Sequence, residues 1–225
     1  MIPWIELDRT TLPQGGDLRL MRRGHEFSIK LGVAELMTSR LFASEEALAT
    51  LAAERLKDRA KPRILIGGLG MGFTLRAALT AFGTEARIVV AELVPAVVRW
   101  ARGPMAELFA GRLDDRRVEI VEADVAALIR TAKSQYDAIL LDVDNGPEGM
   151  TQSDNDQLYA MRGLAAARAA LRPGGVLAVW SQGPDRAFAK RFEKAGFSVE
   201  EKQVRAGGAR GGSRHTIWLG ARPDH

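Results

Sequence analysis

The chain contains no cysteine, so disulfide bonds, thiolate metal sites and a cysteine nucleophile are all excluded. No apolar run reaches the roughly 20 residues that a membrane-spanning helix needs, and Met1–Asp8 lacks the apolar core of a secretory signal peptide. The three histidines, His25, His215 and His225, are scattered without metal-binding spacing. We therefore expect a cytoplasmic protein with no metal centre and no membrane segment.

Charge of neither sign dominates the sequence. The chain of 225 residues has 32 Lys and Arg against 28 Asp and Glu, a net charge of +4, and the arginines are spread along it. This distribution predicts a solvated surface of mixed charge, and it leaves nucleic-acid binding open as the alternative. There is no Gly-Lys-Ser/Thr sequence, which excludes a P-loop.

Apolar runs alternate with helical patterns from Lys61 onward. The strands are predicted at 63–66, 87–91, 118–121, 136–141 and 176–180. Helices are predicted between them at 74–82, 95–102, 125–133 and 156–171. Continuous apolar strands separated by helices favour a parallel sheet covered on both faces. Residues 172–175, Arg-Pro-Gly-Gly, are expected to form a turn before the fifth strand.

The two ends of the chain depart from this alternation. Residues 197–205 and 216–221 read as two strands joined by a glycine-rich loop, hence as an antiparallel hairpin. Five parallel strands followed by such a hairpin are the outline of the class I methyltransferase fold, a doubly wound, Rossmann-like α/β sheet. Residues 1–42 predict a small β appendage with two strands around Gly24, which leaves 43–225 as the catalytic domain.

Three alternate glycines, Gly68, Gly70 and Gly72, follow the first predicted strand of the sheet and precede a helix. Such a turn lets the backbone approach a nucleotide, and the helix offers its N-terminal amides and the positive end of its dipole. A Gly-x-Gly-x-x-Gly nicotinamide motif would need a small residue where Phe73 stands. The spacing therefore favours S-adenosylmethionine over a nicotinamide cofactor.

Acidic residues stand at or just beyond the ends of the next three apolar runs: Glu92, Asp124 and Asp142. Ligands of doubly wound sheets bind at the carboxyl ends of the strands, so these side chains are expected to converge. Glu92 is placed to accept hydrogen bonds from both ribose hydroxyls of a nucleoside. Asp124 is placed to bind the exocyclic amine of adenine, to cap the following helix, or to do both.

Three segments of the chain resemble the spermidine synthase-like branch of the class I methyltransferase superfamily, the polyamine aminopropyltransferases. They are Gly68–Arg76, Tyr136–Asp142 and Leu171–Leu177. The resemblance implies S-adenosylmethionine or its decarboxylated form as the cofactor, and a homodimer. It also implies that Asp142 is the catalytic residue, which accepts a proton or hydrogen bond from an attacking amine.

The chain departs from this family at several positions. The family's second acid falls at Asn145, where the neighbouring Asp144 could substitute, and an aspartate of its glycine turn falls at Met71. A Tyr-His-Glu run aligns with Ser-Glu-Glu at 44–46, where only Glu46 is retained, and a glutamine aligns with Glu35. The resemblance thus implies Glu46, Asp144 and Asn145 as substrate residues.

Trp180 ends the fifth predicted strand and is a further substrate candidate, because its ring could stack on a ligand or simply pack in the core. The loop of residues 205–214 could close over a substrate or remain a solvated hairpin tip.

We therefore expect a transferase that moves a group from a sulfonium nucleoside to a small acceptor, an amine. Methyl transfer from S-adenosylmethionine is slightly favoured because several polyamine-binding residues are altered. Aminopropyl transfer from the decarboxylated form is the alternative. A nucleic-acid methyltransferase and a catalytically silent nucleoside-binding module are further alternatives, and the acidic loop after Asp142 disfavours nucleic acid as a partner.

Overall fold

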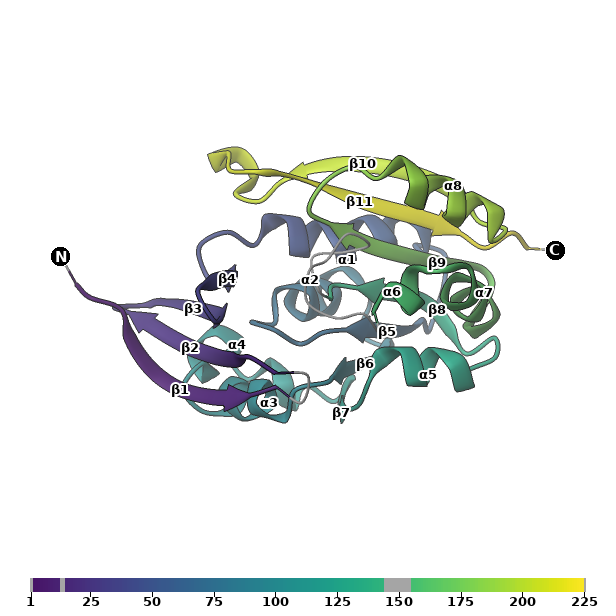
Figure 1. The fold of residues 1–225 in the computed structure, drawn as a ribbon. Coiled ribbons are helices and arrows are strands. Elements are labelled where there is room, and N and C mark those ends of the chain that lie inside the picture. Colours follow the sequence, from purple (N-terminus) through teal and green to yellow (C-terminus); the bar gives the residue numbers. More distant parts are fainter. Residues whose placement is uncertain (1, 13–14, 144–154, 225) are drawn as a thin grey trace.

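Two β-sheets organise the chain in a computed structural model that describes residues 2–12, 15–143 and 155–224 (Figure 1). The smaller sheet is antiparallel, in the order β1 (Ile5–Thr11), β2 (Asp17–Arg23), β3 (Glu26–Leu31) and β4 (Ala34–Thr38). It has two strands more than the sequence predicted. Neither β1, which is almost wholly exposed, nor β4, which is only five residues long, contains a fully buried residue.

The larger sheet has seven strands in the order β10-β11-β9-β8-β5-β6-β7. Its strands are β5 (Arg63–Gly67), β6 (Arg87–Glu92), β7 (Val118–Glu122), β8 (Tyr136–Leu141), β9 (Leu171–Ser181), β10 (Ser198–Arg205) and β11 (Arg214–Ala221). The first five are mutually parallel, while β11 pairs antiparallel with both β9 and β10. This arrangement confirms the predicted class I methyltransferase-like sheet. The strand order reverses at β5, between β8 and β6, and that reversal is where such folds bind ligands.

Helices cover both faces of the larger sheet (Figure 1). They are α1 (Ala43–Arg55), α2 (Phe73–Ala81), α3 (Pro95–Arg102), α4 (Ala106–Phe109), α5 (Val125–Thr131), α6 (Asn155–Tyr159), α7 (Met161–Ala170) and α8 (Arg186–Lys194). Along β5, Ile64 and Ile66 pack in the core of α1, α2 and α3, whereas Leu65 packs with α5 and α7. Among the described residues, no helix is long and apolar enough to cross a membrane.

The region before the fifth parallel strand differs from the sequence prediction. The single helix expected at 156–171 is divided into α6 and α7. The turn expected at 172–175 lies within β9, where the register shifts opposite Tyr136 and Ala138 of β8. Backbone hydrogen bonds explain this, because Gly174 N–H donates to Arg222 (3.0 Å) and Arg222 N–H donates to Gly175 (2.8 Å). The extra residues are therefore held in the sheet as an irregularity rather than released as a turn.

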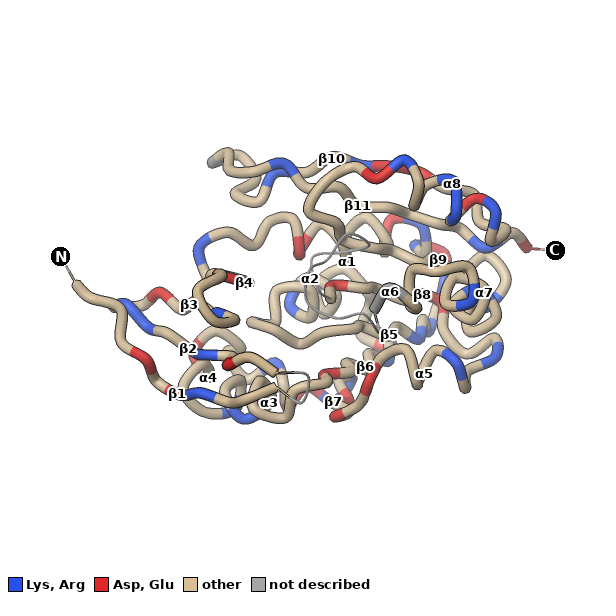
Figure 2. The backbone as a smooth tube through the Cα atoms, viewed as in Figure 1, with Lys and Arg blue, Asp and Glu red and all other residues tan. Residues whose placement is uncertain are grey.

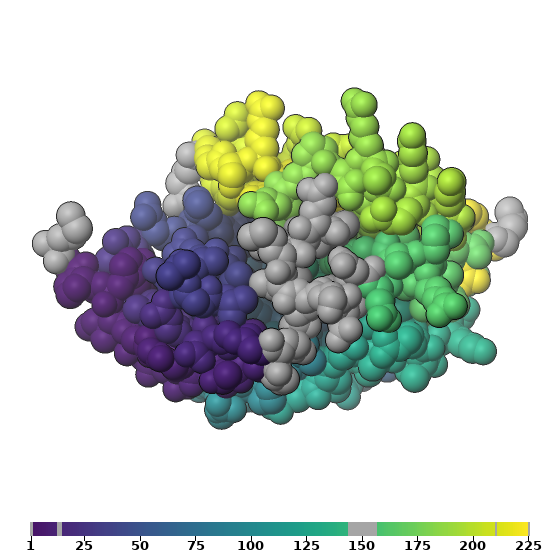
Figure 3. Space-filling view, in the orientation of Figure 1, coloured from purple at the N-terminus to yellow at the C-terminus, as the bar shows by residue number. Residues whose placement is uncertain are grey.

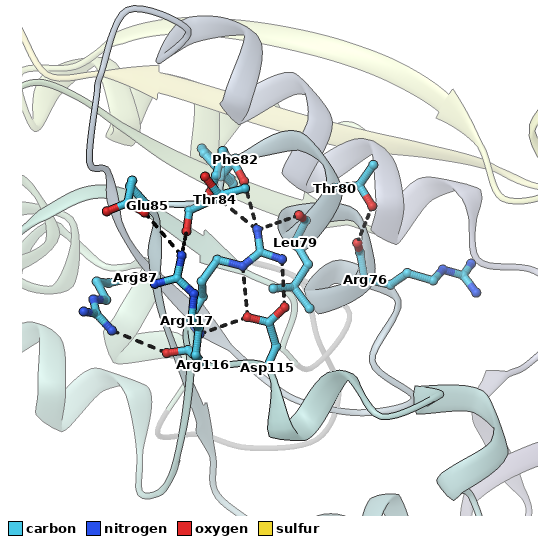
Figure 4. Close-up of polar contacts among 11 residues, drawn as sticks. Arg76, Leu79, Thr80, Phe82, Thr84, Glu85, Arg87, Asp115, Arg116 and Arg117 are labelled. Atoms are coloured by element: carbon cyan, nitrogen blue, oxygen red, sulfur yellow. Dashed lines mark hydrogen bonds and ion pairs between the residues drawn. The ribbon is translucent and has the colours of Figure 1, made fainter.

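An arginine network fixes the chain before β7 against the end of α2 (Figure 4). The Arg117 guanidinium donates to both oxygens of Asp115, at 3.0 and 2.8 Å, and to the Leu79 carbonyl at 2.9 Å. The hydrogen bonds from Arg117 lower the pKa of Asp115 to about 2. Arg116 reaches the Thr84 carbonyl at 3.2 Å. These contacts position β7, and therefore the residues that follow it at the ligand-binding end of the sheet.

Charged residues are dispersed over the molecule. In the view of Figure 2, Lys and Arg alternate with Asp and Glu along the outer helices and strands and do not gather on one face. This agrees with the mixed-charge surface that the composition predicts.

Candidate active site

A cavity of about 230 Å³ lies where the carboxyl ends of the parallel strands meet the N-terminal sheet. Figure 3 shows the N-terminal residues, in purple and blue, packed directly against the rest of the molecule. The cavity brings together most of the residues singled out in the sequence. Its lining includes Gly68, Gly70, Glu92, Asp124, Asp142 and Trp180, together with Glu45. The N-terminal sheet and the residue after β1 supply the opposite wall, formed by Leu12, Leu18, Ile29, Leu31, Leu36 and Met37.

The glycine turn joins β5 to α2 in a conformation that favours glycine. Gly68, Gly70 and Gly72 have φ angles of 90°, 49° and 78°, in the left-handed region. Gly72 does not line the cavity but occupies the N-cap position of α2. Gly68 lies so close to the end of β8 that a Cβ atom would stand 2.6 Å from the backbone oxygen of Asp142. The glycine turn therefore packs closely against the backbone at the end of β8, with no room for a side chain at Gly68.

We predict that Gly68→Ala destabilises the fold by about 2–4 kcal/mol, because it combines a left-handed residue with a backbone clash. The clash would also displace the Asp142 backbone from the cavity. The measurement is urea-induced unfolding of the variant and the parent protein. Gly83→Ala is the matched control, since a Cβ atom there meets nothing within 4 Å. A Gly68→Ala protein as stable as Gly83→Ala would contradict the close fit of the turn.

Glu92 stabilises the glycine turn and the chain after β6 by accepting backbone hydrogen bonds. Its Oε2 accepts a hydrogen bond from the Leu69 amide at 2.9 Å, and its Oε1 accepts one from the Val94 amide at 2.8 Å. The residue is 7% exposed, and its burial raises the pKa of the carboxyl group, while these amide hydrogen bonds oppose the rise. Each carboxylate oxygen can accept a further hydrogen bond. The predicted contact with ribose hydroxyls is therefore compatible with these bonds.

Asp124 caps α5 and also lines the cavity. Its Oδ1 accepts from the Ala126 amide at 2.8 Å, and its Oδ2 lies 3.7 Å from the Arg130 guanidinium. The N-cap interaction that the sequence suggested as one role is therefore present. Asp124 also lines the cavity beside Glu92, because β6 and β7 are neighbouring strands.

Asp142 follows β8 and shares its surroundings with a second acid, Glu45 of α1. The Thr74 hydroxyl of α2 lies 2.8 Å from Asp142 Oδ2 and 3.2 Å from the Glu45 backbone oxygen. The Ser44 hydroxyl donates to Glu45 Oε2 at 2.5 Å. Both residues line the cavity, and the carboxyl groups are near enough for Asp142 to repel Glu45.

The two carboxyl groups hold protons more tightly than exposed acids do. Burial raises the pKa of Asp142 to about 6. Burial, followed by repulsion from Asp142, raises the pKa of Glu45 to about 7. The Thr74 hydroxyl donates to Asp142 Oδ2, and this hydrogen bond opposes the rise in the pKa of Asp142. A cationic amine bound here would favour the ionised form of the carboxyl groups.

Trp180 lies at the end of β9, beside the β8 strand that leads to Asp142. Its ring packs against His215 of β11, with centroids 4.6 Å apart. Burial lowers the pKa of His215, so that side chain is neutral near pH 7. The buried indole N–H of Trp180 has no hydrogen-bond partner among the described residues. Trp180 therefore presents an aromatic surface on the Asp142 side of the cavity.

Among the described residues, one predicted substrate residue, Glu46, does not line the cavity. Glu46 forms an ion pair with Arg76 at 2.7 Å, which joins α1 to α2 outside the lining. Glu35 accepts a hydrogen bond from Ser28 at 2.6 Å and is also absent from the lining. Asp144 and Asn145, and most of the acidic loop around them, lie outside the described residues.

Glu45 is the site residue that sequence reasoning missed. Alignment with the family's Tyr-His-Glu run drew attention to Glu46, one position further along. Adjacent residues on a helix point about 100° apart, and here Glu45 lines the cavity whereas Glu46 pairs with Arg76. The signal available in the sequence was the pair of adjacent acids after Ser44, which lie in the first turn of α1.

The fold is that of the class I methyltransferase-like group, with a cavity at the carboxyl ends of its parallel strands. Comparison with known proteins then identifies the family. Residues 41–191, more than half of the chain, match the Spermine/spermidine synthase domain. The chain belongs to this family.

Two similar curated proteins carry related names. Polyamine aminopropyltransferase 1 of Streptomyces coelicolor is 34% identical over 149 residues, which are 63% of this chain and 27% of that protein. Polyamine aminopropyltransferase of Mycobacterium tuberculosis is 31% identical over 172 residues, 75% of this chain and 31% of the relative. The chain thus spans less than a third of the length of either protein. These names do not support methyl transfer, which the sequence slightly favoured, and they agree better with its aminopropyl alternative.

Solved structures support the fold. Spermidine synthase from Thermotoga maritima superimposes with a TM-score of 0.76 at 19% identity, covering 98% of this chain and 73% of that one. A spermidine synthase in complex with the transition-state analogue AdoDATO gives a TM-score of 0.77, with the same identity and coverage.

Proposed function

We propose that the protein transfers an aminopropyl group from decarboxylated S-adenosylmethionine to an amine. The family assignment and the names of the relatives support this reaction. In this proposal, Gly68, Gly70, Glu92 and Asp124 bind the nucleoside, and Asp142 receives the proton of the acceptor amine.

The observation that carries the choice of donor is the charge of the cavity. Its charged lining residues are Glu45, Glu92, Asp124 and Asp142, and no Lys, Arg or His lines it among the described residues. The methionine arm of S-adenosylmethionine ends in a carboxylate, which would meet only acids here. The decarboxylated arm ends in an ammonium group alone. A buried charge needs an opposite partner, so the cavity favours the decarboxylated donor.

Asp142 and the shape of the cavity supply the catalysis in this proposal. The donor brings a carbon bonded to a sulfonium sulfur, an excellent leaving group that departs as the neutral thioether methylthioadenosine. Asp142 binds the acceptor ammonium, takes one proton from it and leaves the nitrogen lone pair free to attack that carbon. Thr74 holds the Asp142 carboxyl group in place. The remaining contribution is alignment of the nitrogen with the C–S bond.

The test is calorimetric titration with decarboxylated S-adenosylmethionine, S-adenosylmethionine, S-adenosylhomocysteine and methylthioadenosine. We expect the decarboxylated donor to bind at least about tenfold more tightly than S-adenosylmethionine, a difference of about 1.4 kcal/mol. Methylthioadenosine should bind because it keeps the nucleoside and loses the arm. Preference for S-adenosylmethionine and S-adenosylhomocysteine would instead indicate methyl transfer. Binding of none of the four compounds would contradict a nucleoside site in this cavity.

A further inference from the structure

A second cavity, of about 310 Å³, lies at the amino ends of β5, β6 and β7, at the edge of the larger sheet opposite the candidate active site. From it, β5 and β6 run to the glycine turn and to Glu92 over five and six residues, roughly 15 Å at about 3.3 Å per residue. The two cavities are therefore separate. Of the eight residues that line the second cavity, four are arginines and one is an acid: Arg63, Arg87, Arg116, Arg117 and Glu119.

The strand register places two of these arginines side by side. Arg63 and Arg87 are the first residues of β5 and β6, and they are register partners across the parallel pair. Leu65 and Val89, two positions further along, pack together in the core with α5 and α7. Side chains two apart in a strand share a face, so both arginines project from that face on strands about 4.8 Å apart. Two cations held this close repel each other, and an anion between them would remove that cost.

Neighbouring groups hold Arg63 and Arg87 at the cavity. The Arg63 guanidinium lies 5.6 Å from the centroid of the buried Tyr136 ring, and this cation–π contact fixes its direction. The Arg63 amide donates to Asp137 Oδ2 at 2.8 Å, which ties the start of β5 to β8. Arg87 Nη1 reaches the Arg116 carbonyl at 3.4 Å (Figure 4). The fold therefore positions the two guanidinium groups before any ligand binds.

Nearby acids do not cancel the charge of the arginines within the described part of the chain. Arg117 pairs with Asp115 at 2.8 Å, and Arg116 pairs with Glu85 at 3.3 Å. In Figure 4, Arg87 extends away from the Arg117–Asp115 pair. Even when Asp115 and Glu85 are counted together with the acid of the lining, the four arginines outnumber the described acids. The cavity therefore carries a positive charge.

We propose that this second cavity binds a diphosphate group, with Arg63 and Arg87 as its main binding residues. A planar guanidinium donates two parallel hydrogen bonds to phosphate oxygens, and two arginines bring two positive charges to a multivalent anion. The volume equals that of roughly ten water molecules at about 30 Å³ each, which is enough room for two linked phosphate groups. The site takes a ligand of opposite charge at the opposite edge of the sheet, so it is independent of the proposed transfer reaction.

The test is calorimetric titration of the full chain with inorganic pyrophosphate in about 0.1 M salt, where long-range attraction is largely screened. We expect a Kd below about 1 mM for the parent protein and at least about tenfold weaker binding by Arg87→Gln, which loses one charged hydrogen-bond donor. Arg102→Gln is the matched control, because it removes the same charge at a 52% exposed side chain outside the cavity. Absence of binding by the parent protein, or the same affinity in the two variants, overturns the proposal.

Two further anions distinguish the source of the ligand and its chemistry. Uridine diphosphate carries the diphosphate as an ester, and binding that weakens in Arg87→Gln would assign the site to a nucleotide. Binding of pyrophosphate alone would assign it to the free anion. Sulfate should bind at least about tenfold more weakly than pyrophosphate, because it engages fewer guanidinium hydrogen bonds at once. Equal affinity for sulfate would contradict a diphosphate site.

Thermal unfolding shows that loss of binding in Arg87→Gln comes from the cavity and not from the fold. Without ligand, this variant should be at least as stable as the parent protein, because the repulsion between Arg63 and Arg87 is removed. Pyrophosphate at about ten times its Kd should raise the Tm of the parent protein and leave that of the variant nearly unchanged. A variant much less stable than the parent protein would contradict the repulsion on which the proposal rests.

A substitution that strengthens binding tests the same cavity in the opposite direction. Glu119 is exposed in the lining, where its negative charge opposes an anion. We expect Glu119→Gln to tighten pyrophosphate binding about threefold to tenfold. Glu122→Gln is the matched control, since Glu122 is exposed at the other end of β7 and does not line this cavity. Unchanged affinity in Glu119→Gln, or equal tightening in both variants, would contradict an anion site at the amino ends of the strands.

Discussion

Replacement of Asp142 by asparagine is expected to lower kcat by about 10²–10⁴-fold, the range typical for loss of a general base. Asparagine keeps the size of the side chain and the hydrogen bond with Thr74, but it cannot take a proton from the acceptor. Affinity for methylthioadenosine should stay within about twofold, because the nucleoside contacts come from Glu92, Asp124 and the glycine turn. The measurements are steady-state turnover and calorimetric binding on the same preparation.

The pair of readouts separates an enzyme from a silent nucleoside-binding module. Loss of turnover with retained binding supports the proposed role of Asp142. Parallel loss of both would point to a structural role at the end of β8, where the chain fits closely against Gly68. Unchanged turnover would remove Asp142 from the chemistry. Asp114→Asn is the control, because the Asp114 side chain is 79% exposed and lies outside the cavity.

Glu45→Gln is expected to stabilise the unliganded protein at pH 8 by about 2–3 kcal/mol, even though it removes an acid from the cavity lining. At that pH the parent protein must keep both Glu45 and Asp142 ionised, partly buried and close together. The substitution removes one of these charges without changing the size of the side chain. Functional groups that bind a cation often lower stability when the ligand is absent.

The pH dependence follows from the raised pKa of Glu45. Its value rises from 4.5 to about 7 in the folded protein, chiefly through burial. Between these values the folded state binds more protons than the unfolded state, so stability falls as pH rises through this window. Urea unfolding at pH 5 and pH 8 measures the effect, and the parent protein should lose more stability between them than the variant.

The control for this prediction lies on the same helix. Glu54 is exposed on α1, and Glu54→Gln removes the same charge without touching the cavity. It should change stability by less than about 0.5 kcal/mol at either pH. If Glu45→Gln and Glu54→Gln behave alike, neither the burial of Glu45 nor its repulsion from Asp142 acts in solution.

Much of the fold was determined by the sequence alone. The parallel strands could be predicted because their continuous apolar runs, such as Ile64–Ile66 and Ala138–Leu141, are buried on both faces of the sheet. The hairpin could be predicted because a short glycine-rich loop joins its strands. Glycine at three alternate positions and an acid at each strand end are local patterns, and parallel topology brings strand ends together. The sequence could therefore predict which residues meet at the cavity from the strand ends and the glycine turn: Gly68, Gly70, Glu92, Asp124 and Asp142.

Only the tertiary structure decided which groups face one another. It brought Glu45 next to Asp142, although 97 positions separate them, because α1 packs on α2 and Thr74 bridges the two. It directed Glu46 to Arg76 instead, since neighbouring helix positions point in different directions. It also placed apolar side chains of the N-terminal sheet in the same cavity as Glu45 and Asp142. The raised pKa values of Glu45 and Asp142 arise from burial and proximity, which no local sequence pattern encodes.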